Sequence, residues 1–184
     1  MRSLVAIALA GCVSHVPLAA PQPYAPPEAR EQTYASIGPA LIHDTGALRP
    51  PELILRDGST VVDPTDLLAV VPVDSPTARA AHRARAAHSQ AMSLALGGLT
   101  IELAGAVWSA SALARDLSTN AMQFRREDGL AFATVGVGAV IALASLYYFR
   151  IENRERAAAF ATYDASLRAH LRLCTNGLAI VACP

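Results

Sequence analysis

The fold is decided by LAFATVGVGAVIALASLYYF, the twenty residues at positions 130–149, which include no charged side chain. A second apolar stretch covers 91–114, where Glu102 is the single charge among twenty-four residues. At about 1.5 Å per residue, each stretch is long enough as a helix to cross a hydrocarbon core of about 30 Å. We therefore expect a transmembrane helical hairpin. The alternative is a buried hairpin in a soluble, alanine-rich bundle, but the second stretch lacks the polar face that a soluble helix normally keeps.

The flanking sequence extends this hairpin outside the membrane. Residues 115–129 hold three Arg and three acidic residues and are expected to form the turn. Ser75 followed by Pro76 is typical of a helix start, so the first helix should cover 75–114 and the second 130–172. Beyond the membrane the second helix has an apolar stripe at helical spacing, which should pack on the start of the first helix. The stripe consists of Phe160, Tyr163, Leu167 and Leu171. Arg79, Arg83 and Arg85 should then face Glu152, Glu155 and Asp164 across the two helices, as surface pairs without a functional role.

Small residues line one face of each apolar stretch. On the first helix these include Gly98, Gly105 and Ser109, and on the second Gly138 and Ala142. Small side chains let membrane helices approach closely, and close packing supplies their association in lipid. The two faces should therefore pack against each other or against a second copy of the chain.

Glu102 lies near the middle of the first apolar stretch, and a helical wheel centres its small-residue face on this residue. An ionised carboxylate is costly at that depth, which favours a role in an ion path, a proton site or partner docking. Alternatively, the carboxyl is protonated and hydrogen-bonded to Ser or Thr across the hairpin. A turn centred near position 122 would place Glu102 opposite Ala142, one helical turn from Ser145.

A small outer region of mixed α and β structure is expected at 34–74. Asp57-Gly58 between two short apolar runs predicts a β-hairpin over 52–62 with a primed turn, in which both central residues have positive φ. Asp63 and Pro64 predict a short helix, and 69–73 is expected to form a further strand. The run 178–182 is a candidate for an added strand. The clustered Asp residues are expected in turns and caps rather than in a calcium site.

The first twelve residues have the features of an export signal, with Arg2 followed by a short apolar core. Leu9-Ala10-Gly11-Cys12 resembles the signal of bacterial lipoproteins. The resemblance implies cleavage of residues 1–11 and a diacylglycerol on the sulfur of Cys12. The alternative is an ordinary apolar N-terminus with a chance cysteine. Prolines are dense after Cys12, so residues 12–33 are expected to form an extended tether.

Cys174 and Cys183 flank an Asn-Gly turn signal in the C-terminal segment 173–184. In an exported segment, such a pair is expected to form a disulfide. The three cysteines would then divide into one lipidation site and one disulfide. The alternative is two unpaired thiols in a reducing compartment.

A lipidated Cys12 places the mature N-terminus outside the cytoplasm, and two spans return the C-terminus to the same side. The outer region and the Cys pair would then be periplasmic, with 115–129 in the cytoplasm and the protein retained in the inner membrane. The positive-inside rule favours the opposite orientation, because the two flanks carry six Arg and the turn three. The flanking six are Arg79, Arg83, Arg85, Arg150, Arg154 and Arg156. We expect the export signal to determine the orientation of the hairpin, because it acts first.

Composition excludes several classes of protein. Fifteen Arg, with no Lys, balance fifteen acidic residues, so the basic excess of a nucleic-acid-binding protein is missing. A hydrophobic content of 53% argues against a disordered chain. His82 and His88 lie about 240° apart on a helix and cannot share a metal, and the cysteines are scattered. We expect no metal and no other cofactor.

The sequence holds no nucleophile elbow, P-loop, HExxH motif or dinucleotide-binding glycine pattern, so a catalytic role is not expected. The predicted function is a structural or accessory role in the bacterial envelope, in contact with membrane lipid and with a second copy or an envelope partner. The alternative is a small oligomeric channel or proton-linked accessory that uses Glu102.

Overall fold

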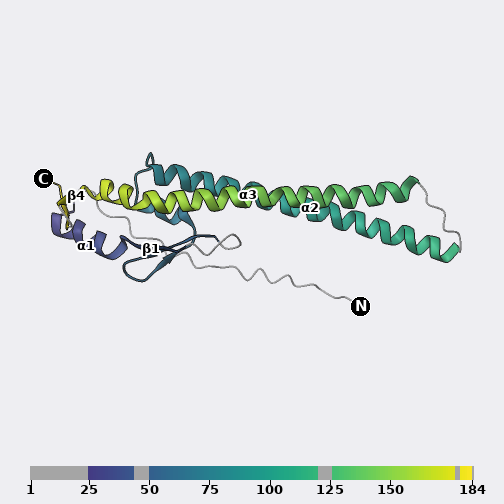
Figure 1. Cartoon of the computed structure of the whole chain (residues 1–184), viewed down its shortest axis with the longest axis horizontal. Coiled ribbons are helices and arrows are strands. Elements are labelled where there is room, and N and C mark those ends of the chain that lie inside the picture. Colours follow the sequence, from purple (N-terminus) through teal and green to yellow (C-terminus); the bar gives the residue numbers. More distant parts are fainter. Residues whose placement is uncertain (1–24, 44–49, 120–125, 177–178, 184) are drawn as a thin grey trace.

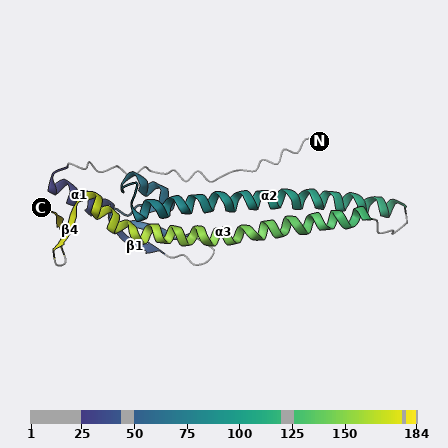
Figure 2. The same ribbon diagram turned by 90° about the horizontal axis from the view of Figure 1, so that it is seen from above.

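The computed structural model describes residues 25–43, 50–119, 126–176 and 179–183. It is dominated by two long antiparallel helices, α2 (Pro76–Thr119) and α3 (Arg126–Leu171). Figures 1 and 2 show the other elements gathered at one end of this hairpin, around the start of α2 and the end of α3. The rest of the hairpin extends away from them as a pair of helices. The expected fold class is confirmed: a mainly α protein with a two-helix hairpin and a small β region.

A seven-residue repeat of small, buried residues holds the two helices together. The repeat on α2 consists of Thr77, Ala84, Ala91, Gly98, Gly105 and Ala112. The repeat on α3 consists of Ala131, Gly138, Ser145, Glu152, Ala159 and Ser166. A strict repeat of seven is typical of helices that supercoil around each other in a left-handed sense. We call these twelve positions the small-residue seam. Glu152 is its one large member.

Glycines make the closest approach in the seam. A Cβ atom added to Gly98 would lie 2.5 Å from the backbone nitrogen of Ala142, and one added to Gly138 would lie 2.5 Å from that of Glu102. Gly105 faces the backbone of Val135 in the same way. The two backbones therefore touch at these levels, and no larger residue fits without moving a helix.

The turn between the helices is shorter than the predicted 115–129. Helix α2 continues to Thr119 and α3 begins at Arg126. Apart from Leu117, residues 115–119 and 126–128 are charged or polar, but they include no Pro or Gly, and Arg and Glu are good helix formers. The charged residues in this part of the chain mark the ends of the apolar stretches, but they do not end the helices. The register also differs from the prediction, because Gly138 rather than Ala142 lies opposite Glu102.

The outer region begins with α1 (Pro27–Ile37) and continues as a three-stranded antiparallel sheet. Its strands are β1 (Pro39–His43), β2 (Glu52–Leu55) and β3 (Thr60–Val61), in the order β1-β2-β3. A short 3₁₀ helix, η1 (Pro64–Ala69), follows. Helix α1 lies partly within the predicted extended tether of 12–33, so the tether prediction is wrong from Pro27 onward. Pro27 stands at the first helical position, where the missing N–H costs nothing.

The hairpin of β2 and β3 is confirmed, but its turn is of another type. The N–H of Gly58 donates to the carbonyl of Leu55 at 3.0 Å, and the N–H of Leu55 donates to the carbonyl of Ser59 at 2.8 Å. Gly58 has φ of 84°, whereas Asp57 does not have a positive φ. This is a three-residue loop that ends in a left-handed glycine, not a primed turn. Hydrogen bonds from the N–H and hydroxyl of Ser59 lower the pKa of the Asp57 carboxyl.

Both expected helix caps are present. Asp63 Oδ1 accepts a hydrogen bond from the N–H of Thr65 at 2.9 Å, and Ser75 Oγ accepts one from the N–H of Ala78 at 3.0 Å. The strand expected at 69–73 does not form. Val70 and Val71 instead turn inward at the end of η1 and are buried. The core removes their apolar side chains from water, so no pairing with another strand is needed.

The core is built between the outer region and α3. The apolar stripe of α3 packs on buried side chains of α1, β2 and η1, including Tyr34, Leu53 and Leu67. The prediction that the stripe packs on the start of α2 is confirmed only in part, because Ala78 belongs to this core but most of the other partners of the stripe lie in the outer region. Helix α2 meets α3 through the small-residue seam. The large apolar side chains of the α3 stripe therefore pack mainly against the outer region. A region of about forty residues cannot bury a sufficient core alone, and α3 supplies the rest of it.

Tyr34 ties α1 to α3 across this core. Its hydroxyl donates to Asp164 Oδ1 at 2.6 Å, and the guanidinium of Arg56 lies 5.3 Å from its ring centre. Burial, followed by the hydrogen bond to Asp164, raises the pKa of Tyr34 to about 12. Burial also raises the pKa of Tyr163, whose hydroxyl donates to the carbonyl of Ile37.

The C-terminal segment forms its own two-stranded sheet of β4 (Leu173–Asn176) and β5 (Ala179–Ala182). The prediction that 178–182 adds a strand to the outer sheet is wrong, because pairing with a neighbour close in sequence closes a much shorter loop. The sheet instead contacts α1, where Glu31 Oε1 accepts a hydrogen bond from the N–H of Ala182 at 2.8 Å. Cys174 and Cys183 lie at disulfide distance, with Cα atoms 5.0 Å apart.

Candidate functional site

The half of the hairpin that extends beyond the outer region has an apolar belt. It covers 89–114 on α2 and 129–149 on α3, with Glu102 as its single charged residue. The twenty-one residues of the α3 part correspond to about 31 Å. By length and composition, both helices are able to cross a membrane.

Large apolar side chains of the belt face outward from the hairpin. The exposed set is Met92, Leu96, Leu99, Leu103, Val107, Trp108, Leu113, Leu130, Phe132, Val137, Val140, Leu143, Leu146 and Tyr147. Small residues fill the interface between the helices, so the large ones have no place inside the hairpin. A soluble monomer rarely exposes a continuous apolar surface of this extent.

Glu102 lies at the edge of the seam with its side chain partly exposed. Its backbone contacts Gly138, but no hydrogen bond or ion pair joins its carboxyl to another residue in the described part of the chain. The expected hydrogen bond across the hairpin is not formed, because Ser145 lies two turns further along α3 and donates to the carbonyl of Ala142 at 2.6 Å. Ser109, also expected on the packing face, has a buried hydroxyl without a hydrogen-bond partner among the described residues.

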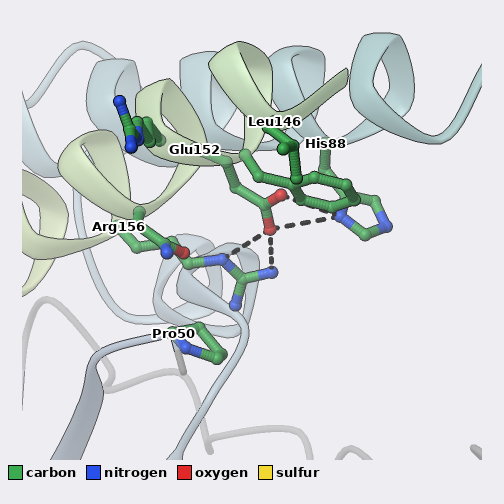
Figure 3. A pocket seen from close by; sticks show the side chains of 8 residues that line it. Pro50, His88, Leu146, Glu152 and Arg156 are labelled. Carbon is green, nitrogen blue, oxygen red and sulfur yellow. Dashed lines mark hydrogen bonds and ion pairs between the residues drawn. The ribbon is translucent and has the colours of Figure 1, made fainter. Parts of the chain in front are cut away.

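A polar cluster built around the buried carboxylate of Glu152 lies where the belt meets the outer region. Glu152 occupies a seam position with a side chain that is only 5% exposed. Its Oε1 accepts hydrogen bonds from Arg156 Nε at 2.8 Å and Nη2 at 2.6 Å. His88 Nδ1 lies 3.1 Å from both carboxylate oxygens, and Arg156 Nη1 donates to the carbonyl of Val62 at 2.6 Å (Figure 3). We call His88, Glu152 and Arg156 the collar cluster. It joins α2, α3 and the outer region.

The cluster forms one wall of an open groove with a volume of about 570 Å³. The groove is lined by Pro50, His88, Leu146, Phe149, Arg150, Glu152, Asn153 and Arg156. The lining is apolar toward the belt, at Leu146 and Phe149, and polar toward the outer region. Figure 3 shows the Glu152 carboxylate between His88 and Arg156, with Leu146 on one side and Pro50 on the other.

Sequence reasoning found part of this arrangement. The expected pairing of the two helices beyond the belt is present between Arg83 Nε and Glu155 Oε2 at 2.8 Å, with the side chains 59% and 20% exposed. Glu152 was expected to face an Arg of α2 on the surface, but it is buried and pairs with Arg156 of its own helix. His88 is a surface residue as expected, with its side chain 49% exposed, and its ring also contacts Glu152. The signal that identifies Glu152 is its position in the repeat of seven, where every other α3 member is small.

Some of the remaining predicted sites lie within the described residues and others lie outside them. Cys12 and its signal lie outside the described residues. Asp57 and Asp63 act in a turn and a cap, as expected. Within the described residues, no group of three or more His, Cys, Asp or Glu side chains is placed to hold a metal ion.

No protein-family model matches this sequence, and no curated protein or solved structure is similar enough to match it. The fold alone therefore defines the class of protein to which the chain is assigned. The chain is a mainly α protein with a small-residue helical hairpin, two helices long and apolar enough to cross a membrane, and a small outer region docked at one end.

Proposed function

We propose that the chain is a lipid-anchored integral membrane protein of the bacterial envelope with a structural or accessory role. In this proposal the belt spans the inner membrane and Cys12 carries a lipid. The outer region and the Cys174–Cys183 pair lie on the periplasmic side. The observation that carries the proposal is the outward-facing apolar surface of the belt, whose length of about 31 Å matches a hydrocarbon core.

The collar cluster supports a rigid connection between membrane and outer region. Arg156 links the Glu152 carboxylate of α3 to the carbonyl of Val62, just before η1. The shared core with α3 fixes the same region at several further points. An outer region held in this way presents its surface at a constant distance from the membrane, which suits a scaffold or an accessory subunit.

Glu102 gives this role an interaction element inside the membrane. Its carboxyl has no partner in the described part of its own hairpin, and an unpaired polar group in hydrocarbon costs several kcal/mol. Pairing with a donor on a second copy, or on an envelope partner, would satisfy it. We therefore include self-association or partner docking in the proposal.

Placing an arginine on the outward face of the belt tests membrane insertion. Val140 is 67% exposed near the middle of the belt, and Val73 is 81% exposed in the outer region. In lipid, Val140→Arg is expected to cost about 3 kcal/mol and to reduce the fraction that resists alkaline carbonate extraction. Val73→Arg serves as the matched control and should fractionate like the wild type. Equal behaviour of both variants, with the wild type extracted as well, would show that the hairpin is soluble.

Mass spectrometry of the N-terminal peptide tests the anchor separately. For protein made in a bacterial host with lipoprotein processing, we expect a chain that begins at a diacylated Cys12. Cys12→Ser should remain uncleaved, yet stay in the membrane through the hairpin. Peptide mapping without reductant should recover Cys174 and Cys183 linked, as an oxidising periplasm requires. An intact Met1 on the wild type, with free thiols, would overturn both the anchor and the proposed orientation.

A further inference from the structure

The groove beside the collar cluster lies where the apolar belt ends. Phe149 is the last residue of the belt, and Arg150 is the first charged residue beyond it. Leu146, Phe149, Arg150 and Asn153 occupy positions i, i+3, i+4 and i+7 of α3, so one face of this helix changes from apolar to polar along the groove. A ligand lying in the groove would therefore meet hydrocarbon-like side chains at one end and hydrogen-bond donors at the other.

The polar end of the groove favours a negative charge. The buried Glu152 carboxylate is already occupied by Arg156 and His88. Arg150 is exposed and makes no ion pair or hydrogen bond within the described part of the chain. Two guanidinium groups thus line the groove against one carboxylate. Guanidinium binds phosphate oxygens with paired hydrogen bonds, and the Asn153 amide adds a further donor.

The geometry points to a binding site for one anionic phospholipid of the surrounding bilayer. The phosphate would lie between Arg150 and Asn153, and an acyl chain would follow Phe149 and Leu146 down the outside of α3. Both ends of the groove are used by this ligand, whereas an inorganic anion would use only one. This inference rests on the proposed membrane insertion and adds the lipid class that the collar would bind.

Native mass spectrometry of the full-length protein in a mild detergent tests the site. Phosphatidylglycerol, phosphatidylcholine and inorganic phosphate are titrated separately. One phosphatidylglycerol should be retained at lower concentration than phosphatidylcholine. Arg150→Gln should raise the concentration for half occupancy by phosphatidylglycerol about fivefold, the effect of one arginine near a lipid surface. Arg154→Gln is the matched control, since Arg154 is exposed on the same helix but does not line the groove, and it should leave the concentration unchanged.

Other outcomes of this experiment would overturn the site. Equal retention of the two lipids, or equal losses in Arg150→Gln and Arg154→Gln, would show a nonspecific annulus. Displacement of phosphatidylglycerol by inorganic phosphate at the same concentration would show a simple anion site. Arg150→Lys keeps the positive charge and should retain the preference for phosphatidylglycerol. This variant therefore tests the site even if the Gln variant has a folding defect. Carbonate extraction of each variant separates these failures from a failure of membrane insertion.

Discussion

A single methyl group added at Gly138 is expected to separate the two long helices. The new Cβ would lie 2.5 Å from the backbone nitrogen of Glu102, and 2.8 Å from both its Cα and the carbonyl oxygen of Gly98. All three atoms belong to the backbone, so no side chain can rotate away, and a helix must move. Overpacking typically costs about 1–3 kcal/mol, which exceeds the gain of about 1 kcal/mol that Gly→Ala gives a helix.

Gly136→Ala is the matched control for this prediction. It lies on the same helix, and an added Cβ would meet no atom within 4 Å. We expect Gly136→Ala to raise the melting temperature in mild detergent or leave it unchanged, and Gly138→Ala to lower it. Spin labels at Leu113 and Leu130, which both face outward, should move apart only in the Gly138 variant. A Gly138→Ala protein that is as stable as the Gly136→Ala protein would contradict the tight backbone contact.

The seam shows how far sequence alone predicts this hairpin. Small residues on facing sides of both helices are evident from the sequence, and Gly98, Gly105 and Gly138 occupy the interface as placed. A helical wheel at 100° per residue drifts by about 20° in each seven residues relative to a supercoiled pair. The wheel therefore groups Ser109 with the packing face and centres that face on Glu102. In the structure the buried positions continue through Gly105 to Ala112, and Glu102 lies at the edge.

The collar cluster marks the limit of sequence reasoning. His88 and Glu152 are sixty-four residues apart, and Arg156 reaches a backbone carbonyl ninety-four residues away. A shift of one helical turn in the register between α2 and α3 would separate these groups. The connection predicted at 115–129 was too long to fix that register. The helix at Pro27 was missed for a different reason. Proline breaks a helix in its interior but is favoured at its first position, and sequence alone did not distinguish the two.

Removal of the Glu152 carboxylate is expected to have the second large effect. Arg156 has a side chain only 13% exposed and would lose the partner that neutralises it. Breaking a buried pair from one side typically costs about 3–5 kcal/mol, because the remaining charge stays desolvated. Alanine occupies the nearby seam positions 84, 91 and 159, so Glu152→Ala should not disturb helix packing itself. Thermal unfolding should show the loss, first in the contacts of the outer region with α3.

Two further variants separate the buried charge from other causes. Glu155→Ala removes the largely exposed pair with Arg83, and we expect a loss of about 0–1 kcal/mol. In the double variant Glu152→Ala with Arg156→Met, no buried charge remains in the collar cluster, and most of the stability should return. The carbonyl of Val62 then loses its donor, so recovery should stop short of the wild type. If the double variant is as unstable as Glu152→Ala alone, the carboxylate acts through packing rather than through Arg156. The collar would then depend on shape, with Glu152 filling the space between α2 and α3.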